Sequence, residues 1–262
     1  MIRKHVFKDK AKNDSVRWRL HEPARVEAFS DAVFAFALTL VVISLEVPQT
    51  FHELLHMMKG FFGFALCFLF IMLIWHDQYL FFRRYGLQDT RTIFYNMVLL
   101  FMVIYLVYPL KFLFYSFTAG FQSTVVEHGV TLARFNNEGE TCQLMIIYGI
   151  GYFTIYSLFG LMHIHALKRR KDILLTPLEI YNTKTHFYTF TGSLGVVMFS
   201  LAIAIVGLSH SGPYAFFSGI SYSLIGLVMW IVGGRRGKRI KQLFSHQEIE
   251  EIKNEIVVLE EK

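Results

Sequence analysis

The apolar run from Ala32 to Leu45 constrains this fold most, because it contains no ionisable side chain. Counted from Ala28, the segment reaches roughly the 20 residues that an α-helix needs to cross a bilayer. Similar runs follow along the chain, in which 54% of the 262 residues are hydrophobic and 27 are Phe. The pattern excludes a soluble domain. It predicts an all-α, polytopic membrane protein with one membrane domain.

The apolar runs predict six transmembrane helices. Pro23 suits a first helical turn, Pro48 ends the first run, and Pro109 predicts a kink in the third helix. The expected helices cover residues 23–47, 52–82, 92–117, 143–167, 186–208 and 214–232. The longest loop between them is expected at 118–141. The resulting division is an N-terminal arm (1–22), a six-helix membrane domain (23–234) and a charged C-terminal tail (235–262).

The positions of the basic residues predict the orientation of these helices. Of the 26 Lys and Arg residues, all but Lys59, Lys111 and Arg134 fall in the N-terminal segment through Arg25, the tail or the links after the second and fourth helices. Cytoplasmic segments carry the excess of Lys and Arg. We therefore expect both termini in the cytosol. The same distribution explains the net charge of +6 without any nucleic-acid partner.

Polar residues are expected to meet near the cytosolic ends of the first three helices. Asp31 lies in the first turns of the first helix, His76 near the end of the second, and Asn96 near the start of the third. Arg25 and Asp31 are about 120° apart around their helix and face each other poorly. We therefore expect His76 or Asn96 to be the partner of Asp31. Such a cluster can serve function or simply hold helices together.

An apolar stripe runs along another side of the first helix. Phe29, Phe36, Leu40, Ile43 and Val47 follow one another at helical spacing. The stripe is also compatible with ordinary helix packing. Thr39 lies beside it, where a threonine commonly bonds a carbonyl of its own helix.

The stretch RVEAFSD resembles the first-helix signature of the transmembrane protein 175 family of potassium channels, Arg-x-x-x-Phe-Ser-Asp. The signature residues fall on Arg25, Phe29, Ser30 and Asp31. Six spans with cytosolic termini also fit one repeat of that family. The resemblance implies a potassium-selective channel and not an enzyme. A single repeat implies a homotetramer in a bacterial or archaeal plasma membrane.

The resemblance also implies which residues form the pore. In the family the first helix lines the pore and large aliphatic side chains narrow it, which on this chain points to Phe36, Leu40 and Ile43, with Thr39 as a threonine layer. Phe36 departs from the usual aliphatic residue and implies a bulkier ring. His76 and Asn96 match the family's contacts between the motif and the next two helices. Potassium is implied as the permeant ion, and no cofactor is expected.

Two other functions remain open from the residues alone. Residues 52–56 read HELLH, in which His52 and His56 could bind zinc with Glu53 as general base of a membrane-bound metalloprotease. The same residues also suit a polar helix start at the membrane interface, and we assign no metal site. A secondary transporter or a proton-permeable channel is the other alternative, although charge at mid-membrane is not evident. Cys67 and Cys142 form no metal or redox motif.

Overall fold

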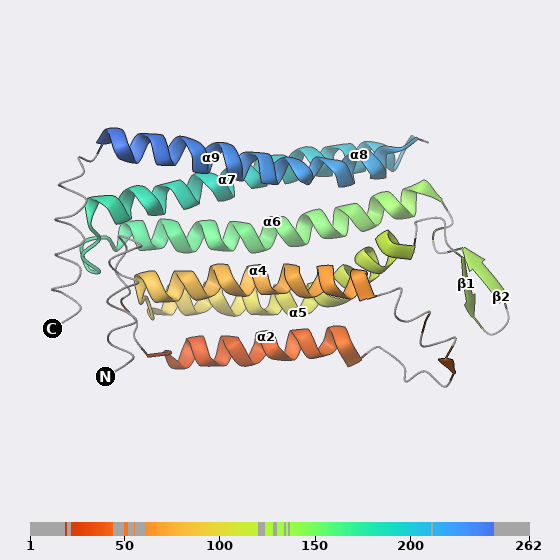
Figure 1. The fold of residues 1–262 in the computed structure, drawn as a ribbon, viewed down its shortest axis with the longest axis horizontal. Helices are drawn as coiled ribbons and strands as arrows, with labels where there is room; N and C mark the ends of the chain where they lie inside the picture. Colours follow the sequence, from red (N-terminus) through yellow and green to blue (C-terminus); the bar gives the residue numbers. More distant parts are fainter. Residues whose placement is uncertain are drawn as a thin grey trace.

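Seven helices and one hairpin make up the part of the chain described here. The computed structural model describes residues 19, 22–43, 50–51, 55, 61–119, 124–127, 130–133, 135, 137–210 and 212–243. The helices are α2 (Arg25–Ile43), α4 (Phe61–Tyr85), α5 (Thr90–Ala119), α6 (Glu138–Lys168), α7 (Pro177–Gly207), α8 (Tyr214–Ser221) and α9 (Ser223–Leu243). They run along a common direction as a bundle (Figure 1).

Consecutive helices pack on one another across the bundle. α2 packs on α4 and α5, α5 packs on α6, and α6 packs on α7, which α8 and α9 cover. α2 therefore lies at one edge of the bundle and α9 at the other (Figure 1). Five stretches are long and apolar enough to cross a membrane: 61–85, 90–114, 138–168, 177–207 and 214–236. α2, as far as its residues are described, is not among them.

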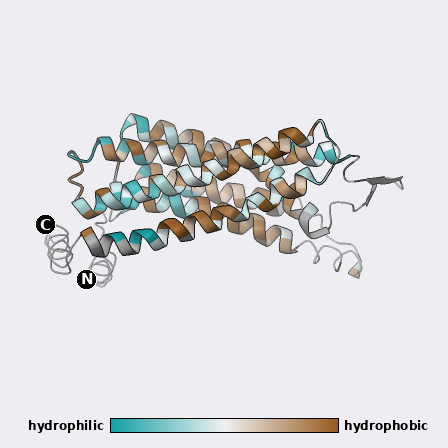
Figure 2. Cartoon of the chain, turned by 90° about the horizontal axis from the view of Figure 1, so that it is seen from above, coloured by the Kyte–Doolittle hydropathy of each residue, from teal (hydrophilic) through white to brown (hydrophobic). Residues whose placement is uncertain are grey.

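Polar colours gather toward one end of the bundle, while the middle is apolar (Figure 2). α2, α5 and α7 begin at this end, and α4, α6 and α9 finish there (Figure 1). We call it the basic end, because Arg83, Arg84, Arg91, Arg169 and Arg236 lie on these helix ends and links.

Helix α6 approaches both of its neighbours closely because it carries glycines on opposite faces. A Cβ at Gly151 would collide with Leu106 of α5, and a Cβ at Gly149 would lie 2.5 Å from Leu201 Cδ2 of α7. Both contacts are shorter than van der Waals packing allows. Glycine therefore lets these leucines lie directly on the backbone of α6.

Several boundaries differ from the sequence prediction. α7 begins nine residues before His186, because Thr176 and Glu179 form a capping box and Pro177 occupies the first turn. α6 begins at Glu138, where the side chain of Asn137 accepts a hydrogen bond from the Glu140 amide at 2.9 Å. Apolar runs mark where a helix is buried, whereas caps mark where it begins.

The remaining differences concern the loop, the last span and the kink. The expected loop at 118–141 contains an antiparallel hairpin of β1 (Thr124–Glu127) and β2 (Val130–Ala133), so the described fold is not purely helical. The last span is divided at Tyr222 into α8 and α9. α5 continues through Pro109, and its final part turns toward α6 (Figure 1). The predicted start of the second helix at residue 52 lies outside the described residues.

Candidate functional site

Helix α2 has one buried face and one exposed face. The buried face consists of Glu27, Ser30, Phe34, Ala37 and Val41, each no more than 2% exposed. Their spacings of three and four residues place them on one side of the helix. This side contacts α4 and α5.

The predicted stripe lies on the opposite side of α2. Phe29 is 62% exposed and Phe36 is 53% exposed, although both are large apolar side chains. Leu40 is half-buried against the core, at the margin of the stripe. Thr39 is exposed and donates a hydrogen bond to the Phe36 carbonyl at 2.7 Å, within its own helix. The backbone of Ile43 ends α2, but its side chain lies outside the described part, as does Val47.

Ser30 joins α2 to a buried hydrogen-bond network. Its hydroxyl donates to the Val26 carbonyl at 2.7 Å and accepts from Asn96 Nδ2 of α5 at 2.9 Å. The oxygen of Asn96 accepts from Gln78 Nε2 of α4 at 3.0 Å. Because all three side chains are essentially inaccessible, the network fixes the contact between α2, α4 and α5.

Asp31 takes a partner that we did not expect. Trp75 Nε1 of α4 donates to Asp31 Oδ1 at 2.7 Å. Asn96 reaches the neighbouring Ser30 instead, and His76 is exposed on α4. Adjacent residues of a helix point about 100° apart, so only one of Trp75 and His76 can face α2. The prediction that His76 or Asn96 binds Asp31 was therefore wrong.

Two further charged residues hold the first turn of α2. Arg83 Nε of α4 forms an ion pair with Glu27 Oε1 at 3.2 Å, and Glu27 is buried. Glu27 Oε2 also accepts a hydrogen bond from the Ala24 amide at 3.3 Å. Our sequence reasoning missed Glu27. The signal available in the sequence was an acidic residue in the first turn of one helix, close to the basic end of the next. Arg25 itself is exposed.

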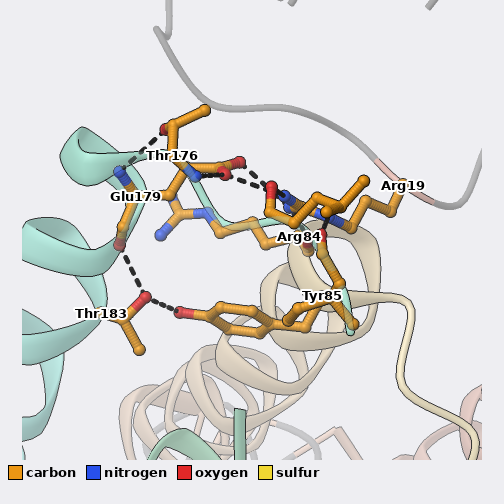
Figure 3. A network of polar contacts seen from close by, with 8 residues as sticks. Arg19, Arg84, Tyr85, Thr176, Glu179 and Thr183 are labelled. Atoms are coloured by element: carbon orange, nitrogen blue, oxygen red, sulfur yellow. Dashed lines mark hydrogen bonds and ion pairs between the residues drawn. The ribbon is translucent and has the colours of Figure 1, made fainter. Parts of the chain in front are cut away.

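Arg19 anchors the chain just before α2. Its guanidinium forms a forked ion pair with Glu179 of α7, through bonds of 3.0 Å and 2.8 Å (Figure 3). It also donates to the carbonyls of Arg84, Ile173 and Leu174 at 2.7, 2.9 and 3.2 Å. We call this set of contacts the Arg19 clamp. It connects the start of α2 with the end of α4 and the start of α7.

The opposite end of α2 is held by a lysine. Lys111 Nζ of α5 donates to the Val41 carbonyl at 3.1 Å. The last carbonyls of a helix have no partners within it and carry partial negative charge. A cation is therefore well placed at this end, and α2 is fixed at both of its ends.

The link between α4 and α5 is also anchored at the basic end. Asp89 accepts a hydrogen bond from Thr92 at 2.6 Å and lies 2.8 Å from His165 Nε2 of α6. Partial burial opposes ionisation of Asp89, but the contacts with Thr92 and His165 outweigh it and lower the pKa of the carboxyl. The pair ties the start of α5 to the end of α6.

The metalloprotease motif falls almost wholly outside the described residues, which include only Leu55 of the HELLH stretch. Within the described ranges, no group of three His, Cys, Asp or Glu side chains could hold a metal ion. Cys67 and Cys142 are buried free thiols.

Comparison with known proteins identifies the family. A family model described as endosomal/lysosomal potassium channel TMEM175 matches residues 25–106, which hold α2, α4 and most of α5. A protein named potassium channel, from Marivirga tractuosa, is 36% identical over 237 residues, covering 89% of this chain and 95% of that protein. The chain belongs to the TMEM175 family of potassium channels. It is therefore an integral membrane channel protein and not an enzyme.

Other TMEM175 relatives agree with this assignment. A potassium channel from Chamaesiphon minutus is 31% identical over 96 residues, covering 34% of this chain and 47% of that protein. The crystal structure of a variant of the potassium channel MtTMEM175, in complex with a nanobody fusion, superimposes with a TM-score of 0.72 at 34% identity. It covers 85% of this chain and 97% of that one. A TMEM175 homologue from Chamaesiphon minutus, at 19% identity and a TM-score of 0.52, shares the fold.

Proposed function

We propose that this channel passes potassium passively through a central pore lined by α2 of four identical subunits. The observation that carries the proposal is the two-sided character of α2. One side is buried against α4 and α5, while Phe29 and Phe36 are more than half exposed on the other. A helix at the bundle edge, anchored on one side and at both ends, is suited to present its free side to a symmetry axis.

The polar residues of α2 support a pore rather than a lipid contact. Arg25, Asp31 and Thr39 are all exposed in the single chain. Ionisable groups in membrane helices generally face protein or water, because exposing them to lipid is costly. In the proposed tetramer Asp31 lies near the inner mouth, where its negative charge attracts cations.

The constriction is formed in this proposal by rings of Phe36, Leu40 and Ile43, with a layer of Thr39. Apolar constrictions can gate by dewetting. Potassium loses its water more cheaply than sodium, so a narrow ring that strips part of the hydration shell favours potassium. A ring of Phe36 is bulkier than an aliphatic ring and narrows the path at that level. No bound cofactor takes part, since the permeant ion is the only ligand that this mechanism needs.

The proposed topology has six spans with both termini in the cytosol. In this proposal α2 is the sixth span, in addition to the five stretches that are long and apolar enough to cross a membrane. The arginines of the basic end then face the cytosol, as the distribution of Lys and Arg requires. Relatives named as potassium channels occur in Marivirga tractuosa and Chamaesiphon minutus, which supports a prokaryotic plasma membrane.

Ion flux in liposomes that contain the purified protein tests the proposed pore. We expect potassium flux to exceed sodium flux. Leu40→Asn and Ile43→Asn should each change the potassium flux or the ion preference severalfold. Asparagine in the constriction holds water where the apolar ring excludes it.

Leu38→Asn is the matched control: Leu38 and Leu40 are both half-buried against the core, but Leu38 lies between Phe34 and Val41 on the anchored side of α2. Protein that folds with this substitution should keep the ion preference of the wild type. Equal changes in preference at Leu38 and Leu40 would contradict the assignment of the pore face. Proton flux without potassium flux would instead favour the proton-permeable alternative, and flux coupled to a second solute would favour a transporter.

A further inference from the structure

Two arginines from different helices converge on one face of α7 at the basic end. Arg84, near the end of α4, lies 2.9 Å from His186 Nε2 through its Nη1 atom. Arg236, on α9, donates from Nη2 to Asn182 Oδ1 at 2.7 Å. Asn182 and His186 are four residues apart, so they occupy the same face of α7. We call Arg84 and Arg236 the arginine pair.

The arginine pair has no carboxylate partner in the described part of the chain. Arg19 and Arg83 form ion pairs with Glu179 and Glu27, whereas the side chains of Arg84 and Arg236 bond to His186 and Asn182. Arg84 and Arg236 also act on each other as like charges. Asp77, two turns before Arg84 on α4, acts on it electrostatically without forming an ion pair.

Most hydrogen-bond donors of the pair remain available. A guanidinium carries five N–H donors and stays protonated under physiological conditions. Each arginine uses one of them in a side-chain hydrogen bond. Both residues are half-buried. Neither contributes a nitrogen atom to the fully buried, unbonded polar atoms of the described residues. The unused donors are therefore accessible from outside the bundle.

An anion with several oxygen atoms fits this arrangement best. Two guanidinium forks can donate to different oxygens of one phosphate group, which also relieves their mutual repulsion. Basic pockets between membrane helices on the cytoplasmic side bind the head groups of anionic lipids. Arg239, exposed three residues after Arg236, adds positive charge on the same side of α9.

We propose that Arg84 and Arg236 form a binding site for a phosphate group, supplied by an anionic phospholipid or by free phosphate. The position at the lipid boundary rests on the topology proposed above, but the phosphate chemistry does not. A bound phosphate would link α4 and α9 through α7. It would therefore join the first and last helices that finish at the basic end.

Thermal unfolding of the detergent-purified full chain tests this proposal. Three additives are compared at equal ionic strength: short-chain phosphatidylglycerol, short-chain phosphatidylcholine and inorganic phosphate. We expect phosphatidylglycerol, inorganic phosphate or both to raise the midpoint in a saturable way, and phosphatidylcholine to do so much less. A response to phosphatidylglycerol alone identifies a lipid site, and an equal response to inorganic phosphate identifies a small-anion site.

Variants show whether the arginine pair is responsible. Arg84→Gln and Arg236→Gln should each weaken the apparent affinity at least tenfold, and Arg84→Lys should weaken it less because it keeps the charge. Arg235→Gln removes the same charge from an exposed neighbour and should change the affinity less than twofold. Absence of any saturable shift in the wild type would overturn the proposal. So would an undiminished shift in the variants. If a variant does not fold, the response of the wild type alone tests the phosphate site. A negative result would overturn the phosphate site but not the proposed pore.

Discussion

At the level of single residues, three side chains of α2 are held by three different partners. Glu27 pairs with Arg83, Ser30 accepts from Asn96, and Asp31 accepts from Trp75. Because these positions point in different directions around the helix, the contacts together fix its rotation. Rotation decides which side chains of α2 remain exposed, so these three residues set the free face of the helix without belonging to the proposed constriction.

The bond between Trp75 and Asp31 gives a direct prediction. Trp75→Phe keeps an aromatic ring beside Tyr79 but removes the indole donor. We expect the free energy of unfolding to fall by about 1 kcal/mol, since the bond is charged but solvent-exposed. Potassium flux should fall as well, because α2 loses one constraint on its rotation. Thermal unfolding and liposome flux measure the two effects.

His76→Gln is the control for this prediction. His76 is adjacent to Trp75 on α4, but it is exposed, and Asp31 is bonded to Trp75 instead. It should behave as the wild type in both measurements. A larger loss of flux for His76→Gln than for Trp75→Phe would show that the contact at Asp31 is not the one that orients α2.

Sequence patterns predicted the level of these residues along the bundle better than they predicted which side chains contact one another. The charge and polarity of Asp31 and Asn96 were sufficient to place both near one end of the helices. A partner depends on the rotation of each helix, and an error of one residue turns a side chain by about 100°. Trp75 therefore took the place expected for His76. Glu27 was missed because a buried acid in a first turn resembles an ordinary helix cap.

At the level of elements, α2 is fastened at its start by the Arg19 clamp and near its end by Lys111. The clamp connects α2 to α7, which α2 does not pack against closely in the bundle. The paired groups are well shielded, since the side chain of Arg19 is 10% exposed and that of Glu179 is 3% exposed. Movement of α7 would therefore be transmitted to the start of α2.

Removing the arginine of the clamp should be costly. Arg19→Gln removes the forked ion pair from the buried carboxylate of Glu179, which we expect to cost about 3 kcal/mol. Glu179→Gln can keep the capping box of α7, because glutamine serves in that position. The double substitution should therefore be no less stable than Arg19→Gln alone. Unfolding of the wild type, the two single variants and the double variant in detergent measures these differences in stability.

Arg169→Gln provides the matched control for the clamp. Arg169 also pairs with an acid, Asp172, but the two side chains are 49% and 59% exposed. Exposed pairs contribute between about 0 and 1 kcal/mol. An equal loss of stability for Arg19→Gln and Arg169→Gln would contradict the structural role of the clamp.

Element boundaries followed local caps rather than apolar runs. The first turns of α7 are polar, so hydropathy placed its start at His186, whereas Thr176 and Glu179 mark the true start. The hairpin of β1 and β2 is only four residues per strand and gave no periodic signal. Within the described residues, the order of the apolar helices agrees with the prediction, because long uncharged runs leave few alternatives.

At the level of the whole molecule, the edge position of α2 is what makes the proposed pore possible. Exposed apolar residues occur on many helices of the bundle, since lipid covers them as readily as protein does. Apolarity alone therefore cannot separate a lipid face from a pore face. The proposal for α2 rests instead on exposed Thr39 and Asp31 beside exposed Phe29 and Phe36, together with the anchoring of its opposite side.

Cysteine accessibility tests the pore-lining role of α2 most directly. The native Cys67 and Cys142 are buried, so a water-soluble thiol reagent should find little to modify in the wild type. Thr39→Cys places a thiol on the exposed side of α2. Thr191→Cys is a matched control on α7, because Thr191 is also exposed and also bonds a carbonyl of its own helix.

The reagent should reduce potassium flux strongly in liposomes that contain Thr39→Cys, because the added group occupies the ion path. It should leave the flux of Thr191→Cys and of the wild type nearly unchanged. Unaltered flux after complete modification of Thr39→Cys would contradict the account, since α2 would then not line the path of potassium.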